Sequence, residues 1–421
     1  MYKKALYIFI FLSFITHPIG DYETGNVILR RVTFSDIFGA LSILFGIPYI
    51  FKGLDLSLKI NKIYLFGFIL FLSFILPVTF SLNVIATLVE SLILLFLILI
   101  SILIFYGFKD SLLKLFLLII YTVLTAAILG FYDIIAEMYG LPRLFRQRTN
   151  AELISGFRNA GQAGAYFMVF LAILFPLKYS ELYKIFNKKQ KILLNISLIM
   201  SVLFLFSTGK IAGWIGFAIG VFLFGIFSKK IKIILTVVVL GISTFFIYQN
   251  LDIIAPNLAK RLEMKVRTRI INQIEGNETN DNFFEKNWGG AVKAFNDNPF
   301  TGTGIGGFYG NYGNYEVHST YLKMVGETGI VGVIGYLFFI ISFIRLFKKP
   351  KKNNFANPYI DYLIKIFPFV IGCLVSWTYT YHIRKREFWI MVAILMIIKY
   401  QAKIYNIKYL KKFNKYERKN L

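Results

Sequence analysis

The sequence has few residues that could build a redox or metal centre. Cys373 is its one cysteine and falls in an expected membrane span, so it can form neither an internal disulfide nor a thiol-based metal site. The three histidines, His17, His318 and His382, are far apart in the chain, which argues against a zinc centre. We therefore expect no metal and no cofactor.

Acidic residues are also scarce. There are 22 Asp and Glu against 47 Lys and Arg, which gives a formal net charge of +25. In a soluble protein this excess would indicate a nucleic-acid partner. Here most lysines lie in short segments between apolar runs, so the positive-inside rule explains them and no nucleic acid is expected.

Few acids lie in or near the apolar runs. Asp36, Glu90 and Asp133 do, and they form no ladder of the kind that a proton-coupled transporter needs. Because a carboxylate inside a membrane is costly, we expect Glu90, the deepest of them, to pair with a buried polar group.

Long apolar runs are what the sequence has in abundance. Of 421 residues, 57% are hydrophobic and 18% aromatic, whereas a soluble domain is about 45–50% apolar. The runs are about 20 residues long, enough to cross a hydrocarbon core about 30 Å thick. They predict an all-α polytopic membrane protein, a single domain over 1–421 without internal repeats. We expect about twelve spans, at 5–19, 32–51, 60–80, 82–106, 111–134, 160–177, 191–208, 211–228, 231–249, 320–344, 360–381 and 388–405.

Charge in the connecting segments predicts the topology. The first run resembles a signal peptide but is followed by HPIGD, without a small-residue cleavage site, so we expect an uncleaved span. With the N-terminus in the cytoplasm, the lysine-rich segments lie inside and an even number of spans returns the C-terminus there. The outer segments are then 17–31, 135–159, 209–210, 250–319 and 382–387.

Arginine follows a different rule from lysine. All arginines except Arg345 and Arg418 fall in the outer segments: Arg30, Arg31, Arg143, Arg146, Arg148, Arg158, Arg261, Arg267, Arg269, Arg384 and Arg386. The guanidinium fork matches phosphate in a bidentate way that lysine cannot. The distribution therefore indicates an anion, a phosphate by chemistry, at the outer face. Alternatively, these arginines bind outer-leaflet headgroups or pair with acids of the loops.

The longest outer segment, 250–319, concentrates the residues that could carry chemistry. It holds a basic piece, a helical WGGAVKAF segment and the glycine run TGTGIGG, and it ends at His318. Loops of this length are usually functional or disordered, and its many aromatic residues argue against disorder. We expect it to fold as a lid over the outer face.

His318 is the first candidate for catalysis. It precedes Ser319 and Thr320, either of which would cap the following helix. A helix N-terminus suits an anion, and a histidine there can take a proton from an acceptor hydroxyl or orient it. Alternatively, His318 is an interfacial residue that packs its ring and bonds a loop carbonyl.

Cations and glycines supply the other candidates. Lys210, in a tight hairpin between two spans, and Arg158, just before a span, could each hold a phosphate or merely reach the interface. Arg267 and Arg269 alternate in RTR, so at most one should face a site. Gly302, Gly304 and Gly306 let the backbone turn tightly and approach a ligand, and they follow no strand, which excludes a nucleotide loop. Glu327 is expected to anchor this loop through hydrogen bonds.

Three segments together resemble a known family. NPFTGTGIGGF followed by EVHSTYLKMVGETGIVG is similar to the histidine-containing pattern of the O-antigen ligase and polymerase family. FRNAGQAGAYFMVFLAILFPL resembles an upstream segment of that family, with Ala160 and Gly161 in place of Pro-Asn. LFSTGKIAGWIGFAIG resembles a third, with Lys210 where arginine is usual. The resemblance covers roughly 150–340.

The resemblance implies an integral-membrane, metal-independent, inverting glycosyltransferase of the bacterial cytoplasmic membrane that works at the outer face. Its donor would be an oligosaccharide on undecaprenyl diphosphate. Its acceptor would be a growing glycan for a polysaccharide polymerase, which we favour, or lipid A-core for a ligase. His318 would activate the acceptor hydroxyl, and Lys210 with Arg267 or Arg269 would bind the diphosphate. Membrane lipid, a flippase and a chain-length regulator are the further candidate partners.

Two other classes compete with this reading. A flippase or transporter for polyprenyl-linked sugars would show internal pseudo-symmetry and cations deep in the spans, and the sequence shows no such halves. A protein that only acts as a scaffold of a polysaccharide-assembly complex would keep its activity without His318 and Lys210.

Overall fold

The computed structural model describes residues 2–19, 33–53, 62–142, 156–157, 159–229, 232, 283–313, 316–348 and 357–417. Throughout these residues the chain is helical or irregular, and its one extended pairing is an isolated bridge between Tyr309 and Gly313. The expected all-α class is confirmed.

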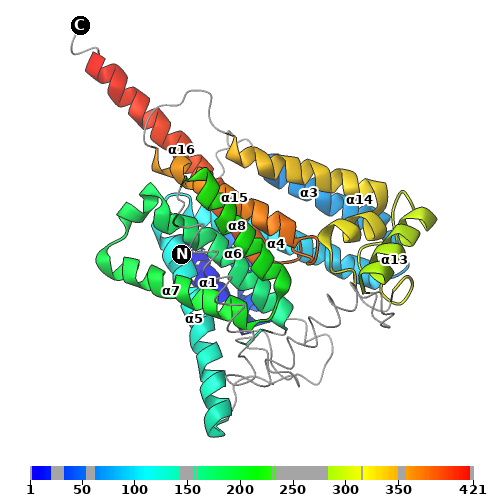
Figure 1. Cartoon of the computed structure of the whole chain (residues 1–421). Coiled ribbons are helices and arrows are strands. Elements are labelled where there is room, and N and C mark those ends of the chain that lie inside the picture. The colour runs from blue at the N-terminus through cyan, green and yellow to red at the C-terminus, as the bar shows by residue number, and fades with distance from the viewer. Residues whose placement is uncertain are drawn as a thin grey trace.

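The helices follow the apolar runs of the sequence (Figure 1). They are α1 (Tyr2–Ile15), α2 (Phe34–Gly53), α3 (Lys62–Ile75), α4 (Val84–Phe108), α5 (Leu112–Tyr139), α6 (Ala160–Tyr179), α7 (Lys188–Ser207), α8 (Ile211–Phe227), α13 (Phe283–Asp297), α14 (Thr320–Ile344), α15 (Pro358–Ser376) and α16 (Arg386–Glu417). Each expected span coincides with one of them, except 231–249, which lies almost wholly outside the described residues. The helical WGGAVKAF segment is α13.

Eight of the described helical segments are long and apolar enough to cross a membrane, with α3 counted together with the 3-10 helix Leu76–Phe80 that follows it. Two of the remaining helices are short. α8 has 17 residues. α1 has 14 residues, so at 1.5 Å per residue α1 is roughly 21 Å long. α2 is one helix with Pro48 inside it, and its described apolar stretch is Phe34–Pro48. The figure of about twelve spans therefore stays a prediction.

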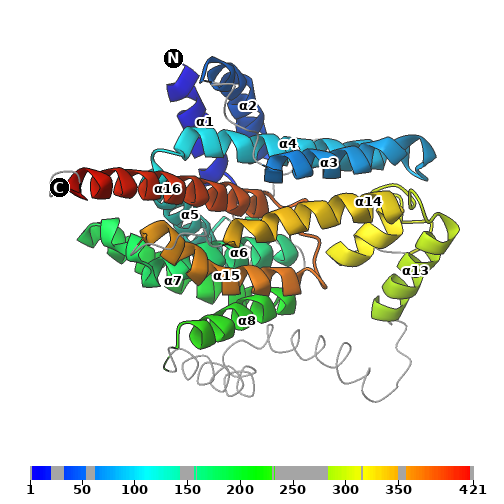
Figure 2. The ribbon, with the colours of Figure 1, turned by 90° about the horizontal axis from the view of Figure 1, so that it is seen from above.

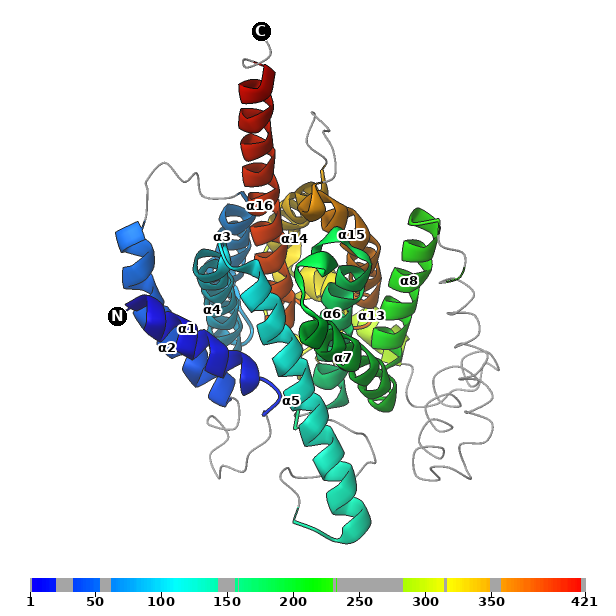
Figure 3. The same cartoon turned by 90° about the vertical axis from the view of Figure 1, so that its left-hand side faces the viewer.

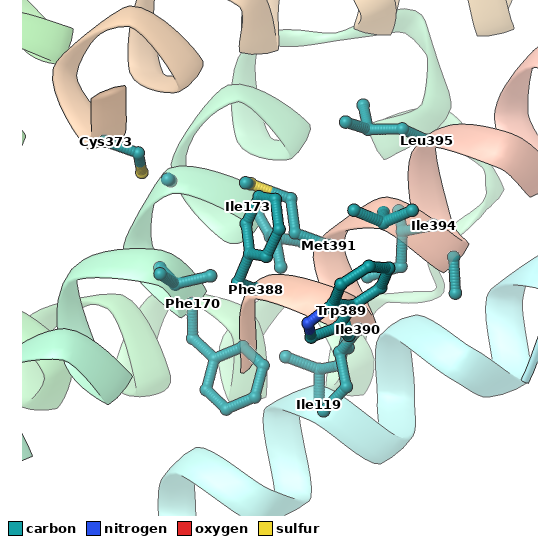
Figure 4. Packing of buried hydrophobic residues seen from close by; sticks show 14 of the residues in the cluster. Ile119, Phe170, Ile173, Cys373, Phe388, Trp389, Ile390, Met391, Ile394 and Leu395 are labelled. Carbon is teal, nitrogen blue, oxygen red and sulfur yellow. The ribbon is translucent and has the colours of Figure 1, made fainter. Parts of the chain in front are cut away.

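Helix α16 forms the centre of the bundle. Its stretch from Phe388 to Ile398 is wholly buried and packs against α4, α6 and α15. Figure 4 shows Phe388, Trp389 and Met391 of this stretch beside Phe170 of α6 and Cys373 of α15. An apolar helix buried on all sides must lie inside a larger bundle, so the C-terminal part of the chain organises the core.

The remaining helices surround α16. α3 lies between α4 and α14, while α8 packs on α15 and α1 on α2 (Figure 2). In the view of Figure 3, the long axes of α5 and α16 run from the bottom to the top, with the C-terminus of the chain at the top. α13 lies across the end of α14.

Helix α14 is broken near its start. Gly329 has φ 58° and ψ −161°, so 320–328 and 330–344 are two helical pieces. The second piece begins under the preceding loop, because Ile330 N–H donates to the Pro299 carbonyl at 2.8 Å and Val331 N–H to the Phe300 carbonyl at 3.2 Å. The expected single span at 320–344 is thus two pieces, since only glycine tolerates this backbone conformation and the loop supplies the acceptors.

Candidate functional site

The segments that precede five helices meet at one end of the bundle. Leu82 N–H, before α4, donates to the Thr303 carbonyl at 2.9 Å, and Thr320 N–H, at the start of α14, donates to the Trp377 carbonyl at 2.9 Å. The start of α6 lies against Lys210, before α8, and Arg384, before α16, pairs with Glu316. We call this the histidine end, because His318 lies in it.

His318 lies in a short extended segment, 316–319. Val317 and Ser319 are buried, whereas Glu316 and His318 are exposed. Alternate residues of an extended chain point to the same side, so the carboxylate and the imidazole share one face. Val317 anchors the segment in a small core with Ala291 of α13 and Phe308.

The start of α14 is capped as the sequence predicts. Ser319 Oγ accepts a hydrogen bond from Leu322 N–H at 3.3 Å, the usual arrangement at a helix N-terminus. Thr320 Oγ1 donates to the Thr380 carbonyl at 2.7 Å and accepts from His382 N–H at 3.2 Å. His318 is therefore held between a capped helix and the turn that joins α15 to α16.

The surroundings of His318 lower the pKa of its imidazole. Loss of hydration is the largest cause that lowers its pKa below the ordinary 6.5, and the positive charge of Lys210 is the next. Lys323 and Arg384 act in the same direction, whereas Glu316 raises the pKa. The structure thus brings together His318 and Lys210, two residues that the sequence singled out more than 100 positions apart.

Lys210 rests on two glycines of α6. A Cβ at Gly164 would lie 2.8 Å from the Lys210 Cβ, and one at Gly161 would lie 3.2 Å from the Lys210 Cε. Any larger residue at these two positions would displace the lysine stem. The two weaker segments of the family resemblance, FRNAGQAG and STGK, are therefore two sides of one contact, with Lys210 immediately before α8.

The glycine run is folded onto protein. Gly302 and Gly304 have φ 62° and 80°. A Cβ at Gly302 would lie 2.4 Å from the Glu327 carbonyl carbon, and one at Gly304 would lie 2.1 Å from Ser81 Oγ. The expected tight turns are present, but the surfaces that these two glycines approach are α14 and the turn before α4. Gly306, at φ 84°, donates its N–H to Glu327.

Glu327 has a second partner in Lys323. Lys323 Nζ lies 3.1 Å from Glu327 Oε1 and 4.8 Å from the centroid of the Tyr381 ring. The side chains of the pair are only 2% and 1% exposed. A buried ion pair, a backbone N–H and an aromatic face thus connect the short piece of α14 to the glycine run and to the α15–α16 turn.

The α15–α16 turn holds Arg384, a residue that the sequence alone did not distinguish from the other outer arginines. Arg384 Nη1 forms an ion pair with Glu90 of α4, and its Nη2 lies 3.5 Å from Glu316 Oε2. Glu90 therefore has the partner expected for it, although Arg384 is itself partly exposed. The signal was present in the sequence: Arg384 belongs to the outer arginines, but lies in a turn of a few residues rather than in a long loop.

Three of the predicted site residues have no described position. Arg158, Arg267 and Arg269 lie outside the described residues, so their roles stay predictions. Within the described part of the chain, no group of three or more His, Cys, Asp or Glu side chains could hold a metal ion.

Eight candidate spans, an all-helical bundle and charged side chains gathered at one end define the class: a polytopic helical membrane protein. The family model described as O-antigen ligase matches residues 196–337. This match confirms the resemblance to the O-antigen ligase and polymerase family, whose members are glycosyltransferase-like enzymes. It contains Lys210, the glycine run, His318 and Glu327, whereas Arg158 and Arg384 fall outside it. No curated protein matches the chain.

Proposed function

We propose that this protein transfers a glycan from undecaprenyl diphosphate to an acceptor hydroxyl at the outer face of the cytoplasmic membrane, as a polysaccharide polymerase. The observation that carries the proposal is the position of His318. Its imidazole lies immediately before α14, inside the segment matched by the O-antigen ligase family, and loss of hydration and the charges of Lys210 and Arg384 lower its pKa.

In this proposal His318 acts on the acceptor. Its imidazole accepts the hydroxyl proton as the acceptor oxygen forms a bond to the anomeric carbon of the donor sugar. The bond from that carbon to the diphosphate oxygen breaks on the opposite face, and the diphosphate leaves with the electron pair. The configuration at the anomeric carbon is inverted. A base with a lowered pKa is unprotonated at neutral pH, as this role requires.

The cations act on the leaving group. Negative charge grows on the diphosphate in the transition state, and fixed positive groups stabilise it most where water is limited. We assign this role to Lys210 and, as candidates outside the described residues, to Arg158 and to one of Arg267 and Arg269. Segment 250–319 would close over the donor as a lid, and the core of the enzyme would be 150–340. The diphosphate of the donor is already a good leaving group, so the proposal includes no metal and no cofactor.

The test is glycan transfer by purified protein in proteoliposomes that contain the lipid-linked oligosaccharide. His318→Ala should lower the rate by about 10²- to 10⁴-fold, the usual contribution of a general base. His318→Gln keeps a side chain of similar size but loses the basic nitrogen, so it should lower the transfer rate by as much as His318→Ala. Full activity of either folded variant would exclude the catalytic role. Flipping of the lipid-linked sugar by the wild type, without any transfer product, would instead identify a transporter.

Polymerase and ligase differ in what a deletion strain accumulates. Loss of long chains, with one repeat still attached to the final acceptor, is the outcome expected of a polymerase. Loss of every attached repeat would identify a ligase. Proteins that co-purify with the chain would show whether a flippase or a chain-length regulator is among its partners.

A further inference from the structure

Two arginines lie two residues apart around the start of α16 but have different environments. Arg386 pairs with Asp36 of α2, and its side chain is 8% exposed. The side chain of Arg384 is 35% exposed, although it has two carboxylate partners. One guanidinium is therefore enclosed in the bundle, and the other reaches the surface that His318 shares.

The two partners of Arg384 are unequal. Glu90, on Nη1, is 12% exposed and belongs to the rigid helix α4. Glu316, on Nη2, is 53% exposed and lies 3.5 Å away, at the outer limit of a hydrogen bond. Tyr381 supports the guanidinium, with its ring centroid 5.8 Å from Cζ. One edge of Arg384 thus pairs with a largely enclosed acid, and the other meets an exposed acid at the outer limit of a hydrogen bond.

The α15–α16 turn is rigid enough to present this side chain. His382 N–H donates to Thr320 Oγ1 at 3.2 Å, Trp389 Nε1 donates to the Ile383 carbonyl at 2.8 Å, and Lys385 N–H donates to the His382 carbonyl at 2.8 Å. The first of these bonds connects the turn to Thr320, the first residue of α14, two residues after His318, and the other two bonds lie within the turn and the start of α16. The position of Arg384 relative to His318 is therefore set by these hydrogen bonds.

Other charges converge on the same surface. Burial lowers the pKa of Lys385 to about 8, and the positive charges of Arg384 and Lys210 add to this lowering. Glu316 raises the pKa of Lys385, of Arg384 and of His318. The Glu316 carboxylate thus acts electrostatically on all three groups, and a bound dianion would bring a larger negative charge to the same place.

Resting on the function proposed above, we propose that Arg384 binds the donor's diphosphate. Glu90 orients the guanidinium, and Glu316 occupies its open edge until a phosphate oxygen replaces the carboxylate there. An arginine fork matches phosphate in a bidentate way, and the exchange leaves the Glu90 pair intact. The site would then include a turn that lies beyond the segment matched by the family.

The experiment measures binding separately from transfer. The probe is undecaprenyl diphosphate, titrated into the protein in nanodiscs on a His318→Ala background; because this probe carries no sugar, binding is measured without transfer. Arg384→Gln should weaken binding by roughly tenfold or more, the usual cost of removing a charged partner. Arg384→Lys should also weaken it, because the fork is lost, and Glu316→Gln should tighten it. Arg386→Gln is the matched control and should bind as the parent does.

The outcomes separate the two proposals. If the parent protein binds no undecaprenyl diphosphate and the wild type transfers no glycan, the proposed function fails. If the parent binds it and Arg384→Gln binds as tightly as Arg386→Gln, the role of Arg384 is overturned while the function stands. Should Arg384→Gln not fold, Glu316→Gln decides, since it removes the competing carboxylate and leaves Arg384 and Glu90 in place: unchanged or weaker binding contradicts the exchange.

Discussion

The two ends of helix α4 differ in what their charged residues contact. Near its start, Glu90 pairs with Arg384, which comes from an element almost 300 residues away in sequence. Just after its end, Lys109 lies over the rings of Tyr106 and Tyr400, at 5.4 and 5.9 Å from their centroids. At the histidine end, acids and bases from different elements face one another.

The second end, which we call the lysine end, is built from Lys109, Lys348 and Lys399. Lys399 donates to the Lys348 carbonyl at 2.6 Å, and Gln401 donates to the Lys109 carbonyl. Described acids nearby make local pairs, such as Asp361 with Lys365 one helical turn on, at 2.6 Å. Cations here satisfy carbonyls and rings, which is enough to anchor a helix end.

The difference shows what each type of cation is for. Lysines that only mark the side of a membrane need no fixed partner, because their charge acts on the topology of insertion. Ion pairs between distant elements cost entropy and desolvation, so their concentration around His318 indicates a site that must keep its geometry. Four predictions test this contrast, from the largest expected effect to the smallest.

The buried pair of Lys323 and Glu327 should contribute most. Glu327→Gln leaves the buried Lys323 ammonium without a negative partner and replaces one of the two acceptor oxygens by an amide NH₂, so it should lower the free energy of unfolding by about 3–5 kcal/mol. The double variant Lys323→Met with Glu327→Gln should lose less than the sum of the single losses. Thermal and denaturant unfolding in detergent micelles measure both. A single loss below 1 kcal/mol would place this pair with ordinary surface pairs.

Acid should weaken the histidine end through His382. This imidazole is buried, stacks on Trp377 and lies 3.3 Å from Ser376 Oγ. Burial lowers its pKa to about 3, whereas the unfolded chain titrates near 6.5. Between these values only the unfolded state binds the proton, so each unit by which the pH is lowered decreases the free energy of unfolding by about 1.4 kcal/mol. The free energy of unfolding should be measured at pH 7 and at pH 5 for the wild type and for His382→Gln. Between these pH values the wild type should lose about 2 kcal/mol more than the variant. Equal losses would contradict this assignment.

A comparison of two glycines isolates the contact beneath the glycine run. Gly302 and Gly140 both have positive φ, at 62° and 65°, so alanine at either costs roughly 1–2 kcal/mol of backbone strain. A Cβ at Gly140 meets nothing within 4 Å, whereas one at Gly302 meets the backbone of Glu327. Gly302→Ala should therefore destabilise the protein more than Gly140→Ala and slow glycan transfer, while Gly140→Ala should leave the transfer rate unchanged. Equal effects of the two substitutions on stability and on the transfer rate would mean that the glycine run does not need its close contact with α14.

The smallest effect is expected at the lysine end. Lys109→Gln removes the contacts with Tyr106 and Tyr400 and should cost about 0.5–1 kcal/mol, the usual value of an exposed cation–π contact. Transfer kinetics should stay as in the wild type, because the residue follows the far end of α4. A change in the donor KM after Lys109→Gln would break the contrast between the ends.

Several features were predictable from local sequence. Apolar runs of sufficient length predicted the helices, because burying backbone groups in lipid leaves few alternatives to a helix. Ser319 was predictable as a cap from its place before an apolar run. His318 and Lys210 were found through motif spacing and through charge at segment ends.

Other features needed the folded chain. The break at Gly329 depends on carbonyls of residues 299 and 300, and a glycine inside an apolar run does not by itself reveal that acceptors will come from a loop. Arg384 was counted among the outer arginines, but its meeting with Glu90 and Glu316 follows from packing of α16 in the centre of the bundle. The Lys323–Glu327 pair has helical spacing, and only its burial makes it more than a surface pair.

By itself, the sequence determined that this chain is an all-helical membrane protein with an O-antigen ligase-like segment, because apolar length and residue spacing are local properties. Tertiary structure decided which groups lie near one another: His318 and Lys210, Arg384 with Glu90 and Glu316, and the glycine run with α14. Such meetings depend on which helices pack together, and helix packing is set by the shapes of whole faces rather than by any one stretch of residues.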